Sequence, residues 1–132
     1  MKYLFDTNVW IDLERGANAD LLQRAADCTR SQVCVSVVVL GELLTGARYS
    51  SDPARALKSV ETLLLGWPRL GMDEATVETY ATIRDDLRRR GEMIGPNDLW
   101  IAAQAVQHDL ILVTANVDEF SQIPQLIVEN WR

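Results

Sequence analysis

Carboxylates recur along this chain just after short apolar segments that are typical of β-strands, or in the first turns of predicted helices. Asp6 follows the first apolar segment directly. Glu42 lies in the second turn and Asp98 in the first turn of two predicted helices. Polar residues also follow the segment 110–114, namely Asn116, Asp118 and Glu119. In open parallel sheets, the working crevice lies outside the carboxyl ends of the strands, so we expect these side chains to gather there.

The helical surroundings of two of these acids point to a metal. The neighbours of Glu42 three and four residues away are apolar or small, and Asp98 is followed at the same spacing by Ile101 and Ala102. A carboxylate at the rim of a core is costly to desolvate without a positive partner. No Lys or Arg lies at helical spacing from Asp98. A divalent cation such as Mg²⁺ or Mn²⁺, which prefers oxygen ligands, would fill that role.

Short strands that alternate with longer helices must position these acids. We expect strands over 2–5, 32–35, 110–114 and 126–129. We expect helices over 9–14, 17–29, 37–50, 53–65, 74–90, 96–108 and 117–120, with Ser36 and Gly91 as caps. This alternation predicts an α/β fold with a parallel sheet covered by helices on both faces.

Bulk properties restrict the class of protein. The 132 residues, 48% of them hydrophobic, predict a single domain over 1–132 with a real core. The longest apolar run is far too short for a bilayer, and no signal peptide precedes the first acid, so we expect a cytoplasmic protein. Cys28 and Cys34 fit reduced thiols, and His108 is the only histidine, which argues against a His-rich metal site. A net charge of -6 means either that the chain does not bind nucleic acid or that it does so through metal ions and a local patch.

Four segments of the chain resemble the motifs of the PIN-domain nucleases. They are Phe5-Asp6-Thr7-Asn8, the stretch 36–47 with Glu42 in the acidic position, the stretch 94–103 with Asp98, and the stretch 112–120. The ending Val128-Glu129-Asn130-Trp131 is also similar to that of the family. The resemblance covers the whole chain in the right order and is strongest to the VapC-type toxins of bacteria and archaea.

The resemblance implies a three-layer α/β/α sandwich with a mainly parallel five-stranded sheet. It implies an endoribonuclease, dependent on Mg²⁺ or Mn²⁺, that cuts tRNA or rRNA and leaves a 5′-phosphate. It also implies a VapB-like, DNA-binding antitoxin as partner and a homodimer. By match, Asp6, Glu42 and Asp98 are the first three acids of the site. For the fourth we favour Glu119, with Asn116 as a polar orienting residue and Asp118 as the alternative.

Other interpretations remain open at this stage. Each acid has a structural explanation, as a turn residue, a helix-dipole partner or a solvated side chain. Thr7, Asn8 and Thr114 could orient carboxylates or could serve turns and caps. The family also allows a processing nuclease without an antitoxin, or a domain that only binds. Signalling receiver domains are a further class of Mg²⁺-binding α/β proteins, but the lone Asp6 lacks the acidic pair that they need.

Two surface features have no assigned role from the sequence. Arg84, Arg88, Arg89 and Arg90 could contact RNA or could complement the dipole at the end of a helix. Tryptophans are enriched at interface cores, so the expected homodimer makes four residues candidates for its interface. These are Trp10, Leu13, Trp67 and Trp100.

Overall fold

A computed structural model describes all residues, 1–132, and contains one five-stranded sheet. The strands are β1 (Tyr3–Phe5), β2 (Val33–Ser36), β3 (Arg69–Leu70), β4 (Ile111–Val113) and β5 (Ile127–Glu129). Their order is β3-β2-β1-β4-β5, and every neighbouring pair is parallel. The expected parallel sheet is therefore confirmed.

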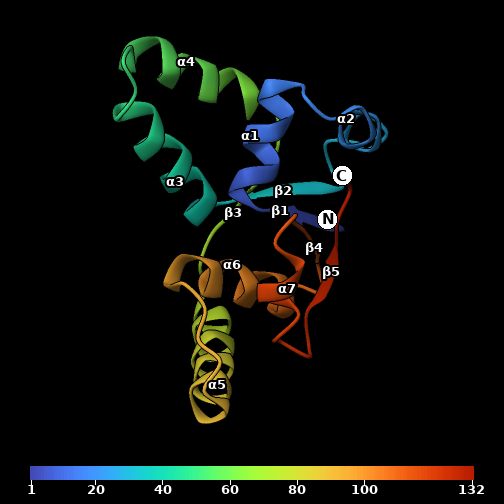
Figure 1. Cartoon of the computed structure of the whole chain (residues 1–132), viewed down its shortest axis with the longest axis vertical. Coiled ribbons are helices and arrows are strands. Elements are labelled where there is room, and N and C mark those ends of the chain that lie inside the picture. Colours follow the sequence, from blue (N-terminus) through green and yellow to red (C-terminus); the bar gives the residue numbers. More distant parts are fainter.

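Seven helices cover the sheet. They are α1 (Thr7–Arg15), α2 (Ala19–Ala26), α3 (Val37–Arg48), α4 (Pro53–Leu63), α5 (Glu74–Arg90), α6 (Pro96–Gln107) and α7 (Val117–Phe120). Figure 1 shows α1 to α4 on one side of the sheet and α5 to α7 on the other, which is the three-layer arrangement that was expected. None of these helices combines the length and the apolar character that a membrane span needs.

Side-chain caps fix where most of the helices begin. Asp6, Asn18 and Ser36 each accept a hydrogen bond from a backbone N–H in the first turn of the helix that follows. The first helix therefore begins at Thr7, two residues earlier than expected, and the second at Ala19, two residues later. Gly91 ends α5 with φ +71°, a left-handed conformation that glycine adopts without a steric cost.

The strand β3 was missed by the analysis of sequence periodicity. It has only two residues, and of these Arg69 is exposed while Leu70 is buried. It pairs with β2 alone, at the edge of the sheet. A two-residue edge strand has too little alternation to be recognised, so only its pairing with Val35 and Ser36 identifies it.

The central strands are buried on both faces. Leu4, Phe5, Cys34, Val35 and Leu112 have no exposed surface, in accord with the continuous apolar character of parallel strands. Trp131 packs back onto this core, where its ring lies edge-on to Phe5 at 5.2 Å between centroids. Both cysteines are free thiols, as expected.

Candidate active site

Asp6 lies between β1 and α1, and hydrogen bonds from α1 and from the end of β4 hold its side chain in place. One carboxylate oxygen accepts a hydrogen bond from the backbone N–H of Val9 at 2.9 Å. The other accepts one from the hydroxyl of Thr114, at the end of the neighbouring strand β4. The side chain is only 6% exposed. Burial raises the pKa of Asp6, while the bonds from Thr114 and Val9 act in the opposite direction.

Glu42 approaches the same edge of the sheet from α3. It is partly buried, and its carboxylate accepts a hydrogen bond from the hydroxyl of Thr7 at 2.7 Å. Because Thr7 is the first residue of α1 and follows Asp6, this bond ties the first two acids together. Glu42 also lines a hollow of about 540 Å³ whose wall includes Asn97, the residue before Asp98.

Asp98 has the most perturbed carboxyl group among these acids. It lies in the first turn of α6 and is partly buried. Burial, followed by the negative charges of Glu119, Glu42 and Asp6, raises the pKa of Asp98 to about 6. Three acids from three other segments of the chain therefore act on the carboxyl group of Asp98.

The residues after β4 differ in how they relate to this cluster. Glu119 is partly buried and accepts hydrogen bonds from the backbone N–H of Gly95, at 3.3 Å, and from the amide of Asn116. Asp118 is exposed and has no side-chain hydrogen bond or ion pair. This placement favours Glu119 as the fourth acid, with Asn116 as its orienting neighbour. Of the other candidates, Thr7 and Thr114 contact the acids, whereas Asn8 is exposed.

A buried glutamine that the sequence analysis missed connects the elements of the site. The side-chain amide of Gln104 donates to the backbone oxygens of Leu70 and Gly71, each at 3.1 Å. Its carbonyl oxygen accepts a bond of 2.5 Å from the hydroxyl of Ser36, which also caps α3. Gln104 thus joins α6, which carries Asp98, to α3, which carries Glu42. A glutamine within the apolar run 101–106 was the available signal.

The donor set fits a hard divalent cation. None of the four acids has a Lys or Arg within ion-pair distance, since every ion pair of the chain involves other acids. All available ligand atoms are oxygens, the type that such cations prefer. No three of the acids are close enough together to ligate one ion directly. The residues therefore fit an ion held by one or two carboxylates, with water at its other positions, as is usual for Mg²⁺.

The arginine cluster is largely paired with acids near it in the sequence. Arg88 and Arg89 pair with Asp85, and Arg90 pairs with Asp86 and Glu92. Arg84 donates to the hydroxyl of Tyr80 at 2.8 Å. The helix-end explanation of this cluster is therefore the better supported one.

The tryptophans proposed for a dimer interface prove to have different environments. Trp10 is 1% exposed and belongs to the core, so its assignment to an interface was wrong. Trp67 is partly buried against Trp10, at 5.8 Å between ring centroids. Trp100 is also partly buried and stacks on Tyr80 of α5, with 3.6 Å between centroids. A second helix thus covers one face of the Trp100 ring. Leu13, the fourth candidate, is partly buried against the core.

Comparisons with known proteins agree with this architecture. The family model for the PIN domain matches residues 3–126. Ribonuclease VapC2 of Haemophilus influenzae is 33% identical over 131 residues, which cover 99% of this chain and 98% of that protein. The tRNA(fMet)-specific endonuclease VapC of Shigella flexneri is 34% identical over the same shares. The DNA-bound VapBC crystal structure from Salmonella typhimurium superimposes with a TM-score of 0.94 at 32% identity, covering 100% of this chain and 99% of that one. The chain therefore belongs to the PIN-domain family, within its VapC group of ribonucleases.

Proposed function

We propose that this protein is a Mg²⁺-dependent endoribonuclease that acts as the toxin of a type II toxin–antitoxin pair, with the carboxylates of Asp6, Glu42, Asp98 and Glu119 as its active site. The observation that carries the proposal is the unpaired acidic cluster at the carboxyl edge of the sheet, where Asp98 has a pKa of about 6. Such a cluster disfavours an anionic substrate until a cation offsets its charge. PIN-domain nucleases in general use a divalent metal, and the all-oxygen donor set favours Mg²⁺, with Mn²⁺ as an alternative.

The four acids have different tasks in this proposal. Asp6 and Asp98 would hold the ion, and Glu42 and Glu119 would bind its water ligands. When bound, such an ion would supply a water of lowered pKa and would stabilise charge on the leaving oxygen. Thr114 and Thr7 fix the orientation of Asp6 and Glu42 through the bonds described above, and Asn116 does the same for Glu119.

The relatives indicate the substrate and the partner. A tRNA-specific relative that is 34% identical over nearly the whole chain favours tRNA over rRNA as the substrate. The VapBC complexes among the structural neighbours, some of them with DNA, support a DNA-binding VapB-like antitoxin. We expect the antitoxin to inhibit by placing an Arg or Lys among the acids, since a guanidinium can grip two carboxylate oxygens. The chain is also expected to form a homodimer.

A receiver-type signalling module is disfavoured by the placement of the lysines. The chain has only Lys2 and Lys58. Lys2 precedes β1 while Asp6 follows it, so the two lie at opposite ends of the strand. Lys58 lies on α4 rather than after a late strand. A lysine near the last acids, which that class needs, is therefore missing.

Cleavage of purified tRNA with and without Mg²⁺ tests the proposal. The wild type should cut tRNA only when Mg²⁺ or Mn²⁺ is present, and chelation should abolish the products. Cleavage that continues in EDTA would contradict the metal-dependent mechanism. Cleavage of rRNA but not of tRNA would contradict the proposed substrate while leaving the mechanism intact.

A further inference from the structure

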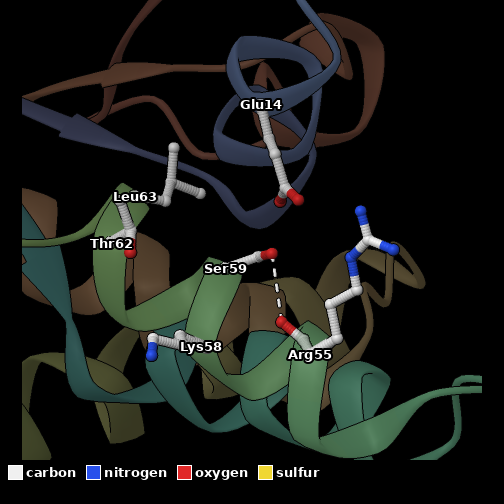
Figure 2. A pocket seen from close by; sticks show the side chains of 6 residues that line it. All are labelled: Glu14, Arg55, Lys58, Ser59, Thr62 and Leu63. Carbon is white, nitrogen blue, oxygen red and sulfur yellow. Dashed lines mark hydrogen bonds between the residues drawn. The ribbon is translucent and has the colours of Figure 1, made fainter.

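A polar hollow lies between α1 and α4. It encloses about 460 Å³. Glu14, Arg55, Lys58, Ser59, Thr62 and Leu63 line it, and only the last of these is hydrophobic. In Figure 2 the carboxylate of Glu14 and the guanidinium of Arg55 both extend into the space between the two helices. The hydrogen bond from Ser59 to the backbone oxygen of Arg55 lies within α4 and leaves that guanidinium free.

This hollow continues to the acidic site. A second hollow of about 400 Å³ shares Glu14 with the first and Glu42 with the hollow at the active site. Its wall also includes Arg15 at the end of α1 and Ala56 on α4. We call these two hollows together the α1/α4 groove. Shared lining residues thus connect the hollow at Arg55 and Lys58 with the hollow at Glu42.

Arg55 and Lys58, the two basic residues of the outer hollow, do not stabilise α4. Neither Arg55 nor Lys58 has an acidic group within ion-pair distance. Arg55 is the third residue of α4, where a positive charge opposes the helix dipole, and Lys58 lies three residues later as a like charge. The arginines of α5 differ in both respects, because they lie in the last turn and are paired with acids.

We propose that the α1/α4 groove binds the RNA strand next to the bond that is cut, with Arg55 and Lys58 contacting its phosphates. The inference rests on the proposed function. The spacing i, i+3, i+4, i+7 places Arg55, Lys58, Ser59 and Thr62 on one face of α4, so cations and hydroxyls alternate along it. Phosphates accept hydrogen bonds from both kinds of group. Glu14, on the opposite wall, can accept a hydrogen bond from a ribose 2′-hydroxyl. The outer hollow, which contains Arg55 and Lys58, has a single hydrophobic lining residue, whereas half of the residues that line the inner hollow are hydrophobic. The phosphate contacts are therefore assigned to the outer hollow.

A binding measurement tests this inference separately from catalysis. The Asp98→Asn protein, with and without the added double substitution R55Q/K58Q, is titrated into a fluorescein-labelled single-stranded RNA of about 12 nucleotides, within the usual site size. Each phosphate contact to a single strand contributes about 0.7 to the slope of log affinity against log salt, so losing two should reduce the slope by about 1.4. If the two proteins bind RNA equally well at about 1 M salt, this difference in slope predicts that the double substitution lowers the affinity about 25-fold at about 0.1 M salt. Both side chains are exposed, so the substitutions should leave the fold intact.

The matched control removes two positive charges from α5, as R88Q/R89Q in the same background. It should change neither the affinity nor the slope. An unchanged slope in R55Q/K58Q, or an equal loss in the control, would overturn the proposal. If R55Q/K58Q keeps its affinity for RNA but escapes inhibition by the antitoxin, the groove binds a protein and the assignment to RNA is wrong. Failure of the proposed function would instead appear as a lack of Mg²⁺-dependent cleavage by the wild type, and the binding comparison would still decide the role of the groove.

Discussion

Replacing Asp98 with asparagine should stabilise the metal-free protein at neutral pH. The substitution keeps the shape of the side chain and removes a charge that is partly buried among Glu119, Glu42 and Asp6. The pKa of Asp98 is about 6 in the folded protein, against an ordinary value of 3.8. The folded state therefore holds this proton more tightly than the unfolded state does.

The direction of the pH effect follows from this difference. Below pH 3.8 the carboxyl group is protonated in both states and contributes nothing to the free energy of unfolding. Between 3.8 and about 6 the unfolded state has released the proton while the folded state still binds it, so stability falls as the pH rises. Above a pH of about 6, Asp98 is ionised in both states, and the folded protein bears the full cost of its charge. A difference of about 2 in pKa corresponds to about 3 kcal/mol. Because the side chain is only partly buried, solvent screening reduces this to about 1–2 kcal/mol.

Urea denaturation in EDTA measures this effect at constant ionic strength. We expect Asp98→Asn to unfold at a higher urea concentration than the wild type at about pH 7.5, and the gap to close as the pH falls towards 4. Asp118→Asn is the matched control, since that acid is exposed and unpaired, and it should show no such pH dependence. A mutant less stable than the wild type at pH 7.5, or an equal gain at both pH values, would refute the reasoning. Adding Mg²⁺ should stabilise the wild type but not Asp98→Asn, because binding to the folded state alone raises stability.

Four further predictions concern activity, architecture and assembly. In Mg²⁺, Asp98→Asn should abolish cleavage of tRNA with an unchanged circular dichroism spectrum, whereas Asp118→Asn should cut at the wild-type rate; the opposite ranking would remove Asp98 from the mechanism. Gln104→Leu should lower the free energy of unfolding by about 3 kcal/mol, because it leaves Ser36 and two backbone oxygens without their buried partner; a loss below about 1 kcal/mol in urea would show that the link is dispensable. Light scattering should give a dimer of the 14.8 kDa chain that Trp100→Ala weakens, and a monomer at micromolar concentration would count against it. Inhibition by the antitoxin should weaken as Mg²⁺ is raised and disappear when the basic residues of its toxin-binding segment are replaced; inhibition that survives all of those replacements would contradict an Arg or Lys among the acids.

Local patterns in the sequence determined most of the architecture. Two helix ends were predicted from their caps, Ser36 and Gly91, because a capping residue satisfies backbone groups within one turn of itself. The caps Asp6 and Asn18 were not recognised, and the starts of the first two helices were each predicted two residues away from their true positions. A parallel sheet could be predicted because the strands are continuous apolar segments separated by helices. Asp6, Glu42 and Asp98 could be singled out because each combines a charge with an inward-facing position at the end of a strand or the start of a helix.

The tertiary structure decided the features that depend on residues far apart in the chain. β3 exists only as a partner of β2, and Gln104 matters only because it meets Ser36, which lies 68 residues away. The choice of Glu119 over Asp118 depends on which of two adjacent acids faces α6. Whether a basic side chain is free to bind RNA depends on its neighbours in space. The arginines near the end of α5 are mostly paired with acids, whereas Arg55 and Lys58 have no acid within ion-pair distance. Composition gives the number of charges, but only the fold determines which of them face one another.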